Sequence, residues 1–280
     1  MKFKMYLEFI KIEHTLFALP FAYAGAIIAG EIDFKIFVLI LTAFTGLRTF
    51  AMAFNRIIDR ELDSLNPRTA KRHLPSGLIT LREAYTIALV GLSIYLISAF
   101  LINWTAFIFS PIPAIVGYVY PYLKRFTCLS HYILGLNLAF APLGGWIAVK
   151  DSINFTLEII FFSIAVLFWV AGFDIIYALQ DLDFDRKHKL HSIGAHFGER
   201  FAKNISKINH VIFFSLLTSI FAKSFFFVLP IIAALLFLEH HIVRKEYTEH
   251  RIQIAFFYIN AIISATVLFS IVARFLLQKL

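Results

Sequence analysis

Two acidic segments carry side chains that recur at helical spacing. In the first, here called the first ladder, the interval is four residues: Asn55, Asp59 and Asp63. In the second ladder the intervals are three, four and four residues: Asp174, Tyr177, Asp181 and Asp185. Residues at these intervals share one face of an α-helix, whereas Asp183 points to another face. We therefore expect each ladder to lie on one face of a helix.

The chemistry of the ladders favours a hard divalent cation. They offer oxygen ligands, and Mg²⁺ in proteins is usually held by a few carboxylates together with substrate phosphates. The predicted metal ligands are Asn55, Asp59, Asp63, Asp181 and Asp185. The four aspartates among them are also the predicted catalytic residues. The alternative, that each carboxylate faces the cytosol and pairs with a nearby arginine, explains one ladder more readily than two.

Basic residues that could bind phosphate oxygens follow the first ladder and a later Tyr-Pro segment. They are Arg68, Lys71, Arg72, Lys124 and Arg125. The positive charge typical of cytoplasmic loops could account for any one of them. Arg48 is different, because it lies in an apolar run, seven residues before Asn55 and on the same helical face. An unpaired arginine facing lipid is costly, so we expect Arg48 to face a ligand.

The ten histidines and the single cysteine show no pattern of metal ligands. Packing near helix ends is the expected role of His14, His131, His210, His240 and His241. Contact with phosphate is the weaker possibility for the three histidines after the second ladder: His188, His191 and His196. Cys128 has no partner for an intrachain disulfide or a zinc site.

The composition indicates that these segments belong to a membrane protein. Of the residues, 60% are hydrophobic and 16% are charged, whereas soluble domains have about 25% charged residues. The net charge of +8 would also suit a nucleic-acid partner, but the charges lie between long apolar runs, so we expect none. The first run lacks a cleavage site and should remain as a helix. Because no long polar interval interrupts the runs, we expect one domain over residues 1–280.

Nine apolar runs are long enough to cross a bilayer, which takes about 20 helical residues. They are 15–30, 34–54, 84–102, 105–122, 131–149, 155–177, 208–222, 224–240 and 254–276. Because only Lys223 and Ser224 separate the seventh and eighth runs, eight spans are the alternative. The predicted fold is therefore all-α, a polytopic membrane bundle of about nine transmembrane helices.

The distribution of basic residues supports nine spans and predicts a cytoplasmic N-terminus. With nine spans, 20 of the 26 lysines and arginines fall on the side of the N-terminus, as cytoplasmic loops require. Two polar loops, 56–83 and 181–207, lie on that side. Each contains the end of one ladder, so the ladders should meet at the same membrane face.

The chain resembles the UbiA superfamily of intramembrane prenyltransferases across nearly its full length. The ladders match that family's Asn/Asp-x-x-x-Asp-x-x-x-Asp and Asp-x-x-x-Asp motifs. Further matching segments are Asn66-Pro67-Arg68-Thr69, Arg72-His73-Leu74-Pro75-Ser76-Gly77 and Tyr120-Pro121-Tyr122-Leu123-Lys124-Arg125. Residues 12–20 and 53–56 are most similar to bacterial 4-hydroxybenzoate-type polyprenyltransferases. His73 and Gly194 stand where many members have proline, which puts loop geometry and acceptor choice in doubt.

The resemblance implies Mg²⁺-dependent transfer of a polyprenyl group from its diphosphate to an aromatic acid such as 4-hydroxybenzoate. It places the enzyme in ubiquinone or menaquinone synthesis, in a bacterial inner membrane with its site facing the cytoplasm. Asp59, Asp63, Asp181 and Asp185, with Asn55, would hold the metal. The implied substrate-binding residues are Arg68, Arg72 and Lys124 for the diphosphate, with Tyr120, Arg48, Asp174, Tyr177 and Asn137.

Other functions remain open at this point. Homogentisate, haem and chlorin are alternative acceptors within the superfamily. A transporter would also carry charges in its helices, but it more often places them near the bilayer midplane, on broken helices. The ladders lie at cytoplasmic helix ends, which favours phosphate chemistry. A non-catalytic scaffold would leave the paired ladders unexplained.

Overall fold

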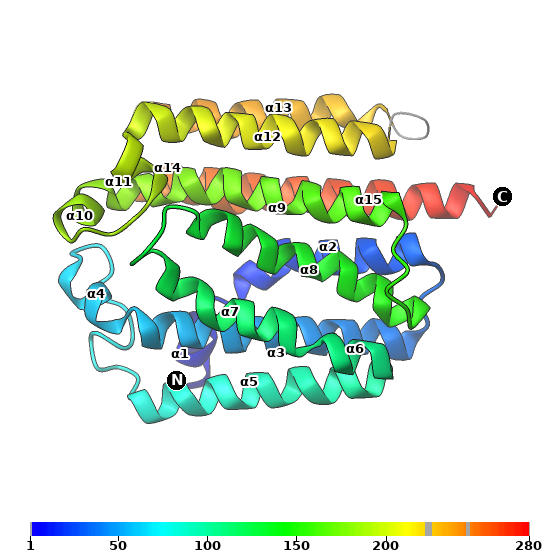
Figure 1. The fold of residues 1–280 in the computed structure, drawn as a ribbon, viewed down its shortest axis with the longest axis horizontal. Coiled ribbons are helices and arrows are strands. Elements are labelled where there is room, and N and C mark those ends of the chain that lie inside the picture. Colours follow the sequence, from blue (N-terminus) through cyan, green and yellow to red (C-terminus); the bar gives the residue numbers. More distant parts are fainter. Residues whose placement is uncertain (1, 222–225, 245–246, 280) are drawn as a thin grey trace.

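The chain folds into helices that run along one common direction (Figure 1). The computed structural model describes residues 2–221, 226–244 and 247–279, and these residues form no strand. The longer helices are α2 (Glu13–Ala29), α3 (Phe34–Ile58), α5 (Leu81–Ile102), α8 (Ser130–Lys150), α9 (Leu157–Ala178), α12 (Glu199–Phe221), α13 (Val228–Ile242) and α15 (Asn260–Leu277). The prediction of an all-α fold is confirmed.

Shorter elements join or extend these helices. They are α1 (Lys2–Phe9), α4 (Arg60–Leu65), α6 (Trp104–Phe109), α7 (Pro111–Leu123), the 3₁₀ turn η1 (Leu179–Asp181), α10 (Leu182–Lys187), α11 (Ile193–Phe197), α14 (Glu249–Ile252) and the π-helix η2 (Gln253–Ile259). The apolar run 105–122 was expected as one helix but is divided between α6 and α7. Pro111 begins α7, because proline lacks the N–H that would continue the preceding helix.

Six helical stretches among the described residues are long and apolar enough to cross a membrane. They are Phe34–Ile58, Leu81–Ile102, Trp104–Leu123, Ser130–Lys150, Leu157–Lys187 and His250–Leu277. A seventh span is possible if α1 and α2, bent by 44°, act together, and α13 is apolar but shorter. Nine spans and a cytoplasmic N-terminus therefore remain predictions. The link between the seventh and eighth expected spans, with Lys223 and Ser224, lies outside the described residues.

The bundle is held together by close helix contacts and an aromatic core around α9. Ile159, Phe162 and Trp169 of α9 are fully buried. Glycines let other helices approach closely: α3 meets α5 where Gly46 faces Gly91, and α2 meets α8 beside Gly145. Small residues allow such approach between helices in membranes, where van der Waals packing replaces the hydrophobic effect as the driving force.

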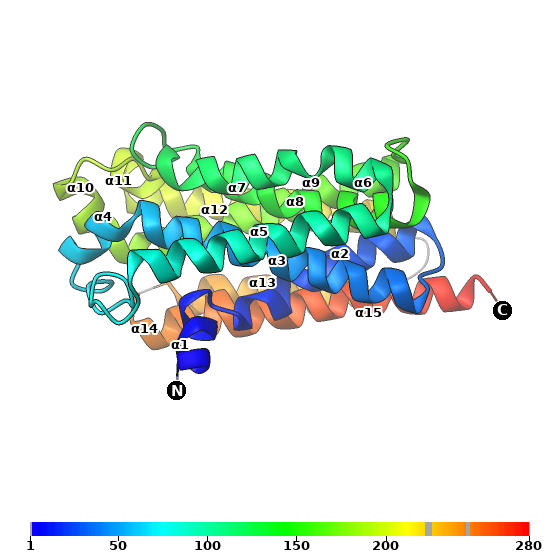
Figure 2. The ribbon, with the colours of Figure 1, turned by 90° about the horizontal axis from the view of Figure 1, so that it is seen from below.

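This packing brings the two polar loops to the same end of the bundle. Figures 1 and 2 show α4, which follows α3, beside α10 and α11, which follow α9, while the C-terminus lies at the opposite end. A hydrogen bond between the Asn66 amide and the Asp181 carboxylate, 2.8 Å long, joins the two loops. The expectation that both ladders meet at one end is therefore confirmed.

The contact between α2 and α8 can be tested with two adjacent glycines. A Cβ atom at Gly145 would lie 2.0 Å from the Ala22 carbonyl oxygen, whereas a Cβ at Gly144 meets nothing within 4 Å. We expect Gly145→Ala to destabilise the protein by about 1–3 kcal/mol through overpacking. Gly144→Ala should leave stability unchanged or raise it by up to about 1 kcal/mol, because alanine favours helix. Thermal unfolding in detergent measures both, and equal melting temperatures for the two variants would contradict the contact.

Candidate functional site

All the predicted site residues line one cavity of about 810 Å³ at the end of the bundle that carries the polar loops. They are Arg48, Asn55, Asp59, Asp63, Arg68, Arg72, Tyr120, Lys124, Asn137, Asp174, Tyr177, Asp181 and Asp185. Of the other proposed cations, Lys71 also lines the cavity. The walls come mainly from α2, α3, α7, α8, α9 and η2, and α1, α4, η1, α10, α14 and the polar loops also contribute residues. Residues far apart in sequence thus share one space.

The first ladder keeps its common face although its helix is interrupted. We expected one continuous helix, but α3 ends at Ile58 and α4 begins at Arg60, with Asp59 at the junction. The backbone N–H of Asp59 still donates to Asn55 O (3.0 Å), and that of Asp63 donates to Asp59 O (2.7 Å). Each step therefore retains helical spacing, and the three side chains face the cavity.

The second ladder is interrupted in a similar way. Asp174 and Tyr177 belong to α9, Asp181 ends η1, and Asp185 lies in α10. The predicted continuous helix is thus a helix, a 3₁₀ turn and a second short helix. Asp183 is exposed and absent from the cavity wall, as its position off the common face predicted.

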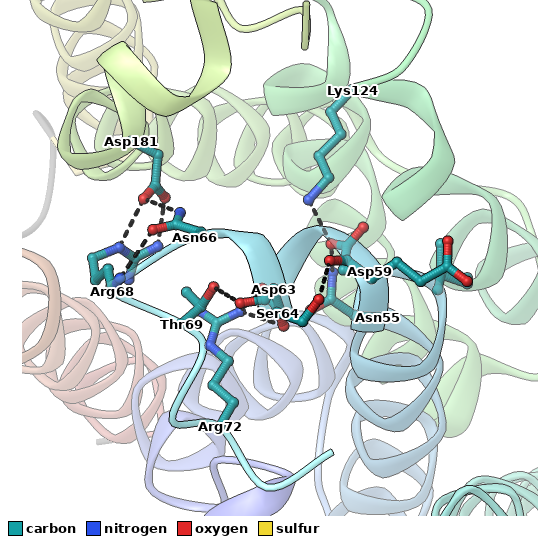
Figure 3. A network of polar contacts seen from close by, with 12 residues as sticks. Asn55, Asp59, Asp63, Ser64, Asn66, Arg68, Thr69, Arg72, Lys124 and Asp181 are labelled. Carbon is teal, nitrogen blue, oxygen red and sulfur yellow. Dashed lines mark hydrogen bonds and ion pairs between the residues drawn. The ribbon is translucent and has the colours of Figure 1, made fainter. Parts of the chain in front are cut away.

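Three of the buried or partly buried carboxylates are paired with cations (Figure 3). Lys124 Nζ lies 2.6 Å from Asp59 Oδ2, and Arg72 Nη1 donates to both oxygens of Asp63 at 2.7 and 2.9 Å. Asp59 and Asp63 are only 4% and 6% exposed. Burying a charge is costly unless it is paired, so these cations offset the cost of burying the two carboxylates.

The pairing of Arg68 with Asp181 links the first polar loop to the second ladder. Arg68 Nε donates to Asp181 Oδ1 at 2.9 Å, and Arg68 Nη1 donates to Tyr177 Oη at 3.3 Å. Although burial opposes its charge, the hydrogen bonds that Arg68 donates to the Asp181 carboxylate raise the pKa of Arg68 above its ordinary value. Arg68 is therefore a permanent positive charge at the point where the two loops meet.

The donor set fits a hard divalent cation. The predicted ligands present carboxylate and amide oxygens to one cavity, and these are the atoms that Mg²⁺ prefers. Asp59 Oδ1 is buried without a hydrogen bond, with Arg125 Nη1 at 3.3 Å. Among the described residues, no three acidic, histidine or cysteine side chains already surround a common point. The carboxylates instead contact basic side chains, so a metal would have to displace some of these contacts.

A second part of the cavity carries polar atoms without partners. Arg48 Nε and Asn137 Oδ1 are buried and make no hydrogen bond. Near them, the Tyr120 hydroxyl accepts a hydrogen bond from Asn55 Nδ2 at 3.0 Å. Buried polar atoms usually have a partner, and exceptions are typical of functional sites. A ligand with an acidic group could satisfy Arg48 here.

His131 is a cavity residue that the sequence analysis missed. We expected it to pack near a helix end, but it is 4% exposed, lines the cavity, and its Nδ1 lies 2.7 Å from Asp174 Oδ2. His14 also lines the cavity rather than only packing near a helix end. The i, i+3, i+7 spacing of His131, Leu134 and Leu138 places all three on the cavity face of α8, and this spacing could have indicated the role of His131.

The remaining histidines divide between the cavity and other regions. Of the three that follow the second ladder, His191 lines the cavity, whereas His188 and His196 do not. His210 and His240 face each other, with Nδ1 and Nε2 2.9 Å apart, away from the cavity wall. The expectation of packing therefore holds for this pair.

The chain is similar to known proteins over most of its length. The model of the UbiA prenyltransferase family matches residues 18–262. A 4-hydroxybenzoate octaprenyltransferase from Vibrio cholerae is 28% identical over 221 residues, which cover 77% of this chain and 76% of that protein.

Two solved structures share the fold. The apo structure of a UbiA homologue from Aeropyrum pernix K1 is 34% identical, covers 96% of this chain and 99% of that one, and has a TM-score of 0.81. The structure of a UbiA homologue from Archaeoglobus fulgidus bound to GPP and Mg²⁺ is 23% identical, covers 96% and 99% of the two chains, and has a TM-score of 0.73.

The ion pair between Lys124 and Asp59 makes a prediction about metal affinity. Replacing Lys124 by methionine removes a positive charge that competes for an Asp59 oxygen, so the protein should bind Mg²⁺ more tightly, roughly tenfold or about 1.4 kcal/mol. Isothermal titration of MgCl₂ into purified protein measures this. Lys150→Met, in the last turn of α8 at the other end of the bundle, is the matched control. Equal or weaker Mg²⁺ binding by the Lys124 variant would show that the two groups do not compete.

Proposed function

Because the chain belongs to the UbiA prenyltransferase family, we propose that it transfers a polyprenyl group from polyprenyl diphosphate to an aromatic acid such as 4-hydroxybenzoate. The reaction would use Mg²⁺ and serve the synthesis of a respiratory quinone, ubiquinone or menaquinone. The enzyme is an integral membrane protein, and we place it in a bacterial inner membrane with the cavity open to the cytoplasm. One observation carries the proposal: a single cavity joins two acidic ladders and their cations to a buried arginine with an unpartnered Nε.

The polar end of the cavity would hold the diphosphate of the donor. Asp59, Asp63, Asp181 and Asp185, with Asn55 in support, would bind Mg²⁺, which neutralises diphosphate oxygens when bound. Lys124, Arg68 and Arg72 lie at the same end and would contact the same oxygens. These basic groups are already held in place by the carboxylates, so their positions need little reorganisation when the ligand enters.

The chemical step would be ionisation of the donor. The allylic C–O bond breaks, and its electron pair leaves with the diphosphate, so negative charge grows next to Lys124, Arg68 and Arg72. Fixed cations stabilise this developing charge more than they stabilise the ground state, and that difference lowers the barrier. The allylic cation left behind reacts with water, so the apolar walls of the cavity must exclude water until the acceptor attacks.

The inner part of the cavity would orient the aromatic acid. Arg48 would pair with the carboxylate of the acid, with Tyr120 and Asn137 contacting the ring substituents. A carbon of the aromatic ring attacks the allylic cation and forms the new C–C bond. The same ring carbon then loses its proton. His131 is suited to accept it, because its Nδ1 is held by Asp174 while its Nε2 is buried without a hydrogen bond.

Release of diphosphate tests the proposal directly. Purified protein with Mg²⁺, a polyprenyl diphosphate and 4-hydroxybenzoate should release diphosphate and form a prenylated acid. Asp59→Ala and Asp181→Ala should each lower turnover on the order of 100-fold or more, because each removes a metal ligand. Asp183→Ala, an exposed aspartate outside the cavity, is the matched control and should retain activity. No diphosphate release with any aromatic acceptor would refute the function, and an active Asp59 or Asp181 variant would refute that residue's role.

The role of Arg48 can be separated from that of the diphosphate end. Arg48→Met should raise KM for 4-hydroxybenzoate roughly 10- to 100-fold, the worth of a charged hydrogen bond. The same substitution should change KM for 4-hydroxybenzamide little, because that acceptor has the same ring without the negative charge. Steady-state kinetics with both acceptors measure the difference. Equal losses for the two acceptors would mean that Arg48 does not bind the carboxylate.

A further inference from the structure

The last membrane helix contains a π-helical segment beside the cavity. Residues Gln253–Ile259 form η2, which lies between α14 and α15. A π turn contains about one residue more than an α turn, and such turns are uncommon and often occur at functional sites. Because one residue corresponds to about 100° of an α-helix, the π segment sets how the residues on either side of it are rotated relative to each other.

One wall of the cavity depends on this rotation. Four residues of this helix line the cavity: Ile252, Gln253, Phe256 and Phe257. Phe256 packs against three rings from two other helices, with centroid distances of 6.1 Å to Phe17 of α2, and 5.1 Å to Phe173 and 4.6 Å to Tyr177 of α9. We call Phe17, Phe173, Phe256 and Phe257 the aromatic wall. On the other side of η2, Ile263 and Val267 of α15 are fixed in the core.

Asn260 holds the π segment in place. Its side chain is fully buried, and Nδ2 donates to two carbonyl oxygens of η2, those of Ala255 and Phe256, each at 3.1 Å. A π turn leaves carbonyls without the regular α-helical partner, and a buried carbonyl without a partner is costly. Both bonds are to the segment immediately before Asn260 in the same helix, so Asn260 supports the π turn without lining the cavity.

We infer that Asn260 is a positioning residue that, through the π turn, fixes the aromatic wall and thereby sets the preference of the enzyme for long prenyl donors. This inference rests on the proposed function. The polar end of the cavity binds the same diphosphate group whatever the length of the tail. Longer tails must place more methylene and methyl groups against the wall, and each buried CH₂ contributes about 0.8 kcal/mol. Loss of the wall therefore penalises long donors more than short ones.

The test compares a short and a long donor with the same acceptor. Wild type, Asn260→Asp and Asn260→Leu are assayed with dimethylallyl and geranylgeranyl diphosphate and saturating 4-hydroxybenzoate. In both variants, the ratio of kcat/KM for the long donor to kcat/KM for the short donor should fall roughly tenfold. A fall of this size corresponds to losing the burial of about two CH₂ groups of the long tail. The change should appear mainly in KM for the long donor, because the diphosphate end is untouched.

Asn209→Leu is the matched control, because Asn209 is also a buried asparagine outside the cavity wall. Its donor ratio should equal that of wild type. An unchanged ratio in folded Asn260 variants, or an equal fall in the Asn209 variant, would overturn the inference. So would loss of the folded protein in both Asn260 variants, which would assign Asn260 to overall stability. If wild type itself releases no diphosphate, the proposed function fails instead.

Discussion

The structure depends on pairing three buried or partly buried aspartates with basic side chains inside an apolar bundle. A carboxylate removed from water is stable as an anion only when positive charge or hydrogen-bond donors surround it. Here that charge comes from the same polar loops and from the end of α7: Lys124 pairs with Asp59, Arg72 with Asp63, and Arg68 with Asp181. Because Arg68 and Asp181 come from different loops, this requirement also fastens the two parts of the bundle to each other.

The bundle then decides where the paired charges lie. Close glycine contacts align α3 with α5 and α2 with α8, and the aromatic core around Trp169 fixes α9. With these helices fixed, the ends of α3 and α9 can only place their ladders at the same opening. The unpartnered Nε of Arg48 lies farther along α3, seven residues before Asn55 and on the same helical face. Helix packing therefore places the paired charges of the ladders and the buried Arg48 in one cavity.

The sequence predicted two kinds of feature: the spacing of side chains along one segment, and the hydropathy of long segments. Helical spacing correctly placed Asp59, Asp63, Asp181 and Asp185 on one cavity, and apolar runs located most of the long helices to within a few residues, although α12 begins nine residues before the run 208–222. It did not predict the breaks at Asp59 and Asp181, since carboxylate spacing is the same in a continuous and an interrupted helix.

Non-local features were out of reach for a physical reason. The partner of a carboxylate is chosen by distance in space, so the pairing of Arg68 with Asp181, 113 residues apart, could not be read from either segment. The same holds for His131, whose role depends on Asp174 of another helix. A π turn differs from an α turn by one residue, and the hydropathy and spacing of residues 253–259 are compatible with either turn. Function in this fold therefore rests on polar contacts between helices, which hydropathy and spacing do not encode.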